Sequence, residues 1–168
     1  MGATKDLKAM SVLSLKSVLI GIVATLTMDV LTVTATKLEL IAPLPPQLIG
    51  RWFASLARGQ AVHGDIDQVP PINHELAVAV PAHYAIGVTL TLLYLFANSA
   101  FGLNSRSLRT ALGFALCTSF LPWLLMFPAM GYGWFGARGR GGARLFPSSL
   151  VTHCFYGFGL WLSVSLLS

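Results

Sequence analysis

The stretch LAVAVPAHYAIGVTLTLLYLFANSAF, residues 76–101, decides the fold, because it contains no lysine, arginine, aspartate or glutamate. A helix needs about 20 mostly apolar residues to cross the roughly 30 Å hydrocarbon layer of a membrane. The run is continuous rather than alternating and is too long for a barrel strand, and only helices or closed barrels satisfy their backbone groups in lipid. We therefore predict a membrane-spanning helix over residues 76–101.

Three more stretches of the same kind lie around it, at residues 13–36, 110–130 and 149–167. Across the chain 55% of the residues are hydrophobic and only 10% are charged, whereas soluble domains carry roughly 25% charged residues. A chain with so little charge could not cover a surface that faces water. We expect a single all-α domain over residues 1–168, an integral membrane protein with four transmembrane helices.

Residues 37–75 form the only long connection between the predicted spans. This connection opens with a helix-breaking segment, Ala42-Pro43-Leu44-Pro45-Pro46. Apolar residues then recur at helical spacing over residues 47–58, with a tryptophan and two arginines among them. Such a composition is typical of the membrane interface. We predict a short interfacial helix here, the alternative being a loop with scattered apolar residues.

The net charge is +5, and the basic residues lie in short segments beside the apolar spans. Contact with anionic headgroups explains this placement more simply than nucleic-acid binding does, so we expect membrane lipids as partners and no nucleic acid. Four crossings put both termini on one side, and the basic residues divide almost evenly between the two sides. Those near Lys16 and in the tight loop with Arg106 and Arg109 lie close to span ends, which favours cytoplasmic termini.

The predicted spans contain one aspartate and two histidines: Asp29, His83 and His153. Asp29 precedes the end of the first span by seven residues and His83 follows the start of the second by seven, a depth of roughly 10 Å at about 1.5 Å per residue. His153 lies four residues into the last span. With four crossings, these three span ends face the same side. We expect all three side chains in one half of the membrane.

Ionisable groups are costly inside a bilayer, so they pair, face the bundle interior or carry a function. One interpretation is structural, in which Asp29 bonds to His83 or to a carbonyl freed by a proline kink and locks the bundle of a structural or assembly subunit. A second is a proton or cation route, since the histidine pKa near 6.5 is easily moved by a neighbour. A third is a divalent metal held by Asp29, His83 and His153, a set that suits zinc or iron.

Four more residues are candidates to support this site: Glu75, Tyr84, His63 and Asp65. Tyr84 is next to His83 and could orient it, and the other three lie in or at the end of the first long loop. In a metal-dependent enzyme acting on a lipid-soluble substrate, Glu75 could serve as the base. A lone four-helix unit is small for a transport path, so a transporter would be expected to form a homo-oligomer.

Several segments together resemble a known family. They are GIVATLTMD at residues 21–29, GRW at 50–52, AHYAIG at 82–87, FPAMGYG at 127–133 and HCFYGFGL at 153–160. The resemblance is to a family of small bacterial inner-membrane proteins known only as a domain of unknown function, and it spans nearly the whole chain. It implies four membrane helices and a bacterial cytoplasmic membrane but no activity. Its recurring segments carry Asp29, His83 and His153.

Overall fold

The structure, a computed structural model, describes residues 15–167, and every regular element in that range is a helix. Four helical stretches are long and apolar enough to cross a membrane: Leu15–Lys37, Glu75–Phe101, Leu108–Ala129 and Gly142–Leu167. The predicted all-α fold with four transmembrane helices is confirmed. The first two spans are single helices, α2 (Leu15–Lys37) and α4 (Glu75–Phe101).

The third span changes its winding partway across the membrane. It consists of α5 (Leu108–Thr118), a π-helical turn η2 (Pro122–Met126) and the short α6 (Phe127–Ala129). Pro122 supplies no backbone N–H, so the regular bonding of the α-helix is interrupted there. The proline therefore divides this span into two segments.

The last span begins earlier than the sequence indicated. A 3-10 turn, η4 (Gly142–Arg144), leads directly into α7 (Leu145–Leu167), whereas the predicted start was residue 149. Pro147 lies in the first turn of α7, where its missing N–H would have no partner in any case. This proline is therefore compatible with an earlier helix start.

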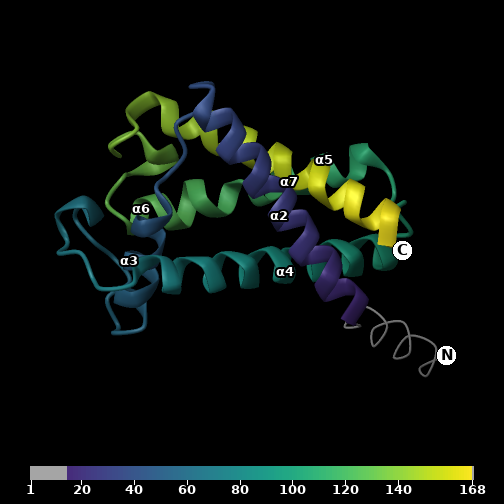
Figure 1. Ribbon diagram of the computed structural model, residues 1–168, viewed down its shortest axis with the longest axis horizontal. Coiled ribbons are helices and arrows are strands. Elements are labelled where there is room, and N and C mark those ends of the chain that lie inside the picture. The colour runs from purple at the N-terminus through teal and green to yellow at the C-terminus, as the bar shows by residue number, and fades with distance from the viewer. Residues whose placement is uncertain (1–14, 168) are drawn as a thin grey trace.

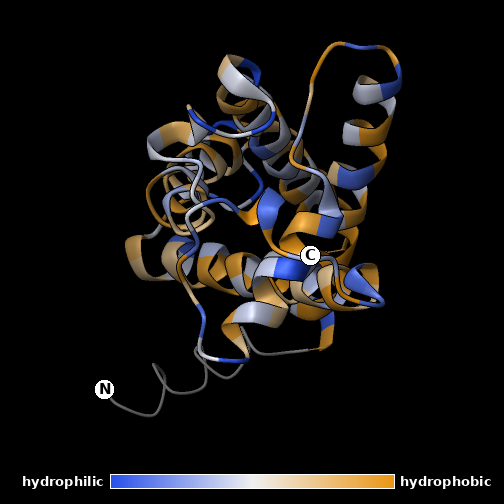
Figure 2. Cartoon of the chain, turned by 90° about the vertical axis from the view of Figure 1, so that its left-hand side faces the viewer, coloured by the Kyte–Doolittle hydropathy of each residue, from blue (hydrophilic) through white to orange (hydrophobic). Residues whose placement is uncertain are grey.

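The spans run alternately, so the long connections gather at one end of the bundle (Figure 1). The end of α2 and the starts of α4 and α7 lie there, together with α3 (Pro46–Leu56), η1 (Ile66–Gln68) and η3 (Trp134–Gly136). We call this end the loop side. Helix α3, the predicted interfacial helix, packs against the start of α4. Viewed from the loop side, polar colouring is concentrated in the connections and helix ends (Figure 2).

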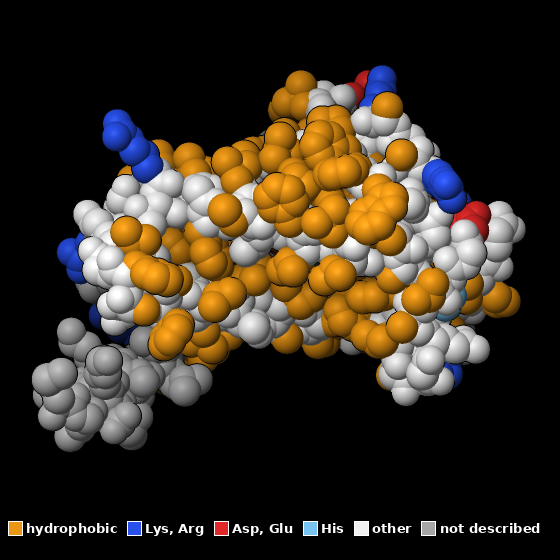
Figure 3. Space-filling model, turned by 180° about the vertical axis from the view of Figure 1, so that it is seen from behind, with side chains coloured by type: hydrophobic (Ala, Val, Ile, Leu, Met, Phe, Trp, Pro, Cys, Tyr) orange, Lys and Arg blue, Asp and Glu red, His pale blue; other side chains and the backbone are white. Residues whose placement is uncertain are grey.

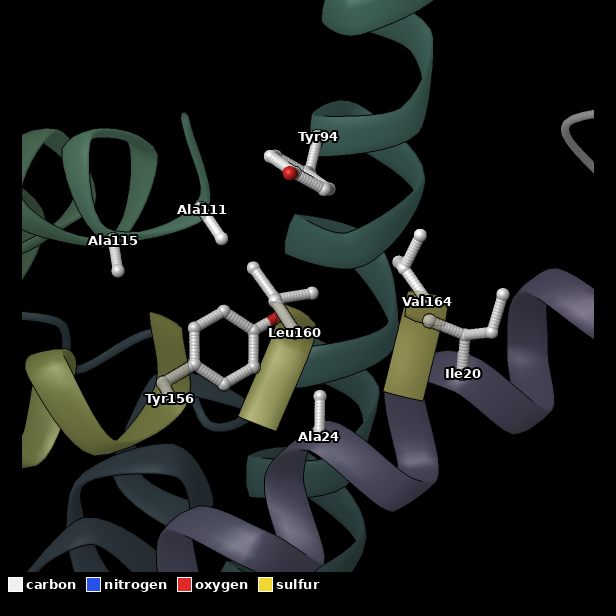
Figure 4. Close-up of a cluster of buried hydrophobic side chains, with 8 residues drawn as sticks. All are labelled: Ile20, Ala24, Tyr94, Ala111, Ala115, Tyr156, Leu160 and Val164. Carbon is white, nitrogen blue, oxygen red and sulfur yellow. The ribbon is translucent and has the colours of Figure 1, made fainter. Parts of the chain in front are cut away.

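Two clusters of buried apolar residues hold the bundle together. One joins all four spans and includes Ala24, Tyr94, Ala115 and Leu160 (Figure 4). The other lies on the loop side and joins α3, η1, the third span and the start of α7. Between charged ends, apolar side chains cover the surface seen in Figure 3, as expected for helices that face lipid.

Candidate functional site

Asp29 and His83 meet inside the membrane. The Nε2 atom of His83 lies 2.9 Å from Oδ1 of Asp29, and the side chains are 33% and 36% exposed respectively. Asp29 precedes the end of α2 by eight residues, and His83 follows the start of α4 by eight. Both therefore lie about 12 Å from the loop-side ends of their helices. This pair is a hydrogen-bonded carboxylate and imidazole that protein atoms cover only in part.

Close packing of α2 on α4 sets the register of this pair. A Cβ on Gly21 would meet Thr91 and the backbone of Val88, and a Cβ on Gly87 would collide with the hydroxyl of Thr25. The successive contacts Gly21–Thr91, Thr25–Gly87 and Asp29–His83 are spaced four residues apart on both antiparallel helices. Small residues allow such close approach of membrane helices. The repeated four-residue spacing was a signal in the sequence that our reasoning missed.

Buried hydroxyl groups surround Gly87, one helical turn further from the loop side than His83. Tyr156 on α7 donates to the Gly87 carbonyl at 2.6 Å, and its oxygen lies 2.9 Å from the Thr91 hydroxyl. Because the Tyr156 proton is engaged with Gly87, Thr91 is the donor in the second bond. Helices α2, α4 and α7 thus meet at Thr25, Gly87, Thr91 and Tyr156.

Tyr84 also lies beside the pair. Its ring packs edge-on against His83, with centroids 5.8 Å apart. Its hydroxyl interacts with the Asp29 carboxylate. The carboxylate is therefore flanked by two consecutive residues of α4.

His153 lies at a similar depth on α7 but does not join the pair through a hydrogen bond. It follows the start of α7 by eight residues, and its Nδ1 lies 3.0 Å from the Ser149 carbonyl oxygen. A carbonyl only accepts, so a neutral His153 is protonated at Nδ1 and keeps its lone pair on Nε2. Within residues 15–167, no group of three or more His, Cys, Asp or Glu side chains is arranged to hold a metal ion.

Glu75 forms a second, buried ion pair on the loop side. Its Oε1 lies 2.7 Å from Nε of Arg51, and both side chains are only 9% exposed. The same oxygen accepts from the Ile72 N–H, and Nη1 of Arg51 donates to the carbonyls of Ile66 and Val69. The Arg51 side chain thus joins α3, η1 and the start of α4. Glu75, considered above as a possible base, is engaged in holding these segments together.

His63 and Asp65 help the first long loop to pack onto the end of the third span. The His63 N–H donates to the Ala129 carbonyl, while the Nε2 atom of its ring is buried without a partner among the described residues. Asp65 accepts from the Asp67 N–H and so caps η1. These contacts give both residues a local role in the loop.

Asp67 links this loop to the last one. One of its oxygens accepts from the Tyr132 hydroxyl at 2.6 Å, and the other lies 3.1 Å from Nε of Arg140. Burial of the Tyr132 side chain, and to a smaller extent the nearby Asp67 carboxylate, raise the pKa of Tyr132 well above its usual value. The Asp67–Tyr132 hydrogen bond therefore joins the first long loop to the last one on the loop side.

Comparison with known proteins places the chain in a family. The family model described as "Protein of unknown function (DUF2938)" matches residues 18–167. No curated protein and no solved structure matches the chain. The match takes in all four spans, the Asp29–His83 pair and the Arg51–Glu75 pair. The chain therefore belongs to the DUF2938 family.

Proposed function

We propose that this membrane protein binds and releases a proton at Asp29 and His83 and so carries protons into or across the bilayer. The observation that supports this function is the hydrogen bond between Asp29 and His83 within the spans, which leaves Nδ1 of His83 without a hydrogen-bond partner among the described residues. By contrast, both members of the Arg51–Glu75 pair make further hydrogen bonds to the backbone.

The chemistry of proton uptake at the pair is simple. In the neutral imidazole, Nε2 carries the hydrogen and donates it to the Asp29 carboxylate, so the lone pair remains on Nδ1 of His83. Proton uptake at Nδ1 converts the ring into an imidazolium whose positive charge is balanced by the carboxylate. The site then changes from one negative charge to neutral. Such a change reduces the electrostatic cost of keeping an ionised aspartate at this depth.

The hydroxyl groups around Gly87 lie one helical turn beyond this pair, toward the other side of the membrane. Hydroxyls both donate and accept hydrogen bonds, so they can relay a proton by exchanging partners. Thr25 and Thr91 are fully buried and Tyr156 is 3% exposed. The proposed route enters from the loop side, reaches His83 and continues through Thr91 and Tyr156.

Proton flux in liposomes tests the proposal. Purified protein is reconstituted with a pH-sensitive dye inside the vesicles, and a potassium diffusion potential drives proton uptake. We expect flux above that of protein-free vesicles, and loss of this flux in Asp29→Asn and in His83→Gln. His153→Gln is the matched control, because it removes a histidine of similar depth that is not bonded to Asp29.

Each outcome has a distinct meaning. Normal flux in Asp29→Asn protein that inserts and stays folded would refute the proposal and favour the structural interpretation. Loss of flux in His153→Gln as well would restore the three-residue site considered from the sequence. Metal analysis of the purified protein beside His83→Gln adds a separate readout, since a bound metal lost in that variant would favour the metal interpretation.

For its location, we propose the bacterial inner membrane with both termini in the cytoplasm. The basic residues Lys16, Arg106 and Arg109 lie close to span ends on the terminal side and support this orientation. Reporter fusions at the C-terminus and within the loop after Gly59 would distinguish the two orientations. We also propose a homo-oligomer, because a single four-helix unit offers little protein around a transport path, and cross-linking in native membranes tests this.

A further inference from the structure

A groove on the loop side separates the end of α2 from the start of α7. Its volume is about 260 Å³, and it is lined by Glu39, Leu40, Ile41, Arg144, Pro147 and Val151, among others. The segment after α2 is fixed to α7, because the Ala42 N–H donates to the Ser148 hydroxyl at 2.9 Å. The two helix ends lie side by side in Figure 1. Because both spans end here, the groove lies at the depth of the lipid headgroups.

Glu39 occupies its position at a local energetic cost. It has φ +59°, and its N–H and that of Leu40 bond back to Thr36 and Ala35, which is the usual way for a glycine to end a helix. A residue with a side chain is strained in this conformation. Its negative charge also lies just beyond the C-terminus of α2, where the helix dipole favours a positive charge such as that of Lys37 in the last turn. Glu39 is therefore unfavourable at this position both in its backbone conformation and in its charge.

Arg144 is placed unfavourably in the opposite sense. It immediately precedes α7, so its positive charge lies at a helix N-terminus, where the dipole favours a negative charge. Neither Arg144 nor Glu39 forms an ion pair within residues 15–167. The groove therefore has a negative pole, made of Glu39 and the end of α2, and a positive pole, made of Arg144 and the start of α7.

We propose that this groove binds the headgroup of a phospholipid with a primary amine, as in phosphatidylethanolamine. The phosphate would contact Arg144, and the ammonium would contact Glu39. Leu40, Ile41 and Val151 offer apolar walls for the acyl chains. The phosphate would balance the positive charge of Arg144, and the ammonium would balance the negative charge of Glu39. Such a ligand therefore offsets the unfavourable charge placement at both helix ends.

The primary amine of the headgroup should determine which lipid binds in the groove. An ammonium with three N–H groups can donate to the Glu39 carboxylate and to carbonyls, whereas the choline group has no N–H to donate. A glycerol headgroup has no positive charge for the negative pole. We therefore expect phosphatidylethanolamine to be preferred over phosphatidylcholine and phosphatidylglycerol, with N-methylated ethanolamine lipids in between.

Native mass spectrometry of the full-length protein with equimolar lipids of matched acyl chains measures this preference. We expect the wild type to bind phosphatidylethanolamine about fivefold better than phosphatidylcholine, the ratio given by one net hydrogen bond from the ammonium. In Glu39→Gln the ratio should fall toward one, because a neutral amide oxygen accepts a weaker hydrogen bond from the ammonium than a carboxylate does. In Arg144→Gln, binding of both lipids should fall. Arg138→Gln, which changes a loop arginine outside the groove, should behave as the wild type does.

Glu39→Gly guards against misfolding as an explanation. Glycine relieves the strain at this position, so the lipid-free variant should melt at a higher temperature than the wild type. It should nonetheless lose the preference for phosphatidylethanolamine. Equal binding of the two lipids by the wild type, or an unchanged preference in Glu39→Gly, would overturn the proposal. An equal loss in Arg138→Gln would do so too, since it would indicate attraction by general basic charge.

Discussion

Two ion pairs among the described residues, Arg51–Glu75 and Asp29–His83, differ in almost every physical respect. Arg51–Glu75 is 9% exposed on both sides, and both members make further hydrogen bonds to the backbone. Asp29–His83 is about one third exposed, and His83 makes no other hydrogen bond among the described residues. The first pair joins three segments outside or at the edge of the membrane, and the second lies within the spans. Burial with full bonding suits a structural clamp, whereas a ring nitrogen of His83 without a hydrogen-bond partner among the described residues is available to bind a proton.

The largest stability loss is expected at the clamp. Glu75→Leu leaves the Arg51 charge buried without its partner, and breaking a buried pair in this way costs about 3–5 kcal/mol. The measurement is thermal unfolding in detergent, followed by tryptophan fluorescence. The double variant Arg51→Met, Glu75→Leu should recover part of the loss, because an apolar pair replaces two charges. A loss below that of Asp29→Asn would invert the comparison between the two pairs.

Tyr132→Phe tests the hydrogen bond between Tyr132 and Asp67 on the loop side. Loss of the hydrogen bond to the Asp67 carboxylate should cost about 2 kcal/mol at neutral pH. Because the folded-state pKa of Tyr132 is raised above its unfolded value near 10, the stability it contributes is complete below pH 10. That contribution is lost as the pH rises through the folded-state pKa.

The measurement for this variant is unfolding by denaturant at several pH values. The difference in stability between the wild type and Tyr132→Phe should be constant near neutral pH and should shrink above pH 10. A difference that grew with pH would contradict the assigned direction of the pKa shift. A difference absent at neutral pH would show that the Asp67–Tyr132 hydrogen bond does not stabilise the fold.

Gly87→Ala tests what holds the Asp29–His83 pair in register. The added Cβ meets the Thr25 hydroxyl, so α2 and α4 must separate, at about 1 kcal/mol or more for overpacking. We expect proton flux to fall as well, because the pair lies one turn away. The control is Gly113→Ala, where nothing lies within 4 Å, and which should be neutral or slightly stabilising. Unchanged flux in a destabilised Gly87→Ala protein would show that proton transfer at the Asp29–His83 pair does not depend on the close packing at Gly87.

Asp29→Asn should have the smallest effect on stability. Hydrogen bonds between membrane helices contribute about 1 kcal/mol or less, and asparagine can still bond to His83. The melting temperature should therefore change little while proton flux is lost. A stability loss as large as that of Glu75→Leu would mark Asp29–His83 as a second clamp and would remove the contrast between the pairs.

Most of the fold followed from the apolar runs. The four spans and the helix at Pro46–Leu56 were predicted to within a few residues, since length and hydropathy determine them. The main error was the start of the last helix, which was predicted at residue 149 and lies at Leu145, with Pro147 in the first turn. The interruption at Pro122 forms a π-helical turn, which hydropathy does not indicate.

The candidate site was only partly predictable. Counting residues from the span ends placed Asp29 and His83 at one depth, but whether they meet depends on how α2 rotates about its axis. The glycine contacts fix that rotation, and a single sequence does not say which small residues touch. The Arg51–Glu75 pair was missed because its members are 24 residues apart and Arg51 lies among interfacial residues. His153 lies at a similar depth but forms no hydrogen bond with Asp29 or His83, so depth alone does not predict contact.

The distance in sequence between Asp29 and His83 also has a consequence for biosynthesis. His83 is made 54 residues after Asp29, which at about 5–20 residues per second is a delay of roughly 3–10 seconds. During this interval α2 enters the membrane with a carboxylate whose partner does not yet exist, at an insertion cost of at most about 3 kcal/mol. The apolar residues around Asp29 must offset this cost unaided, so replacing a few of them with polar residues would prevent insertion of α2 even where the finished bundle would tolerate the change.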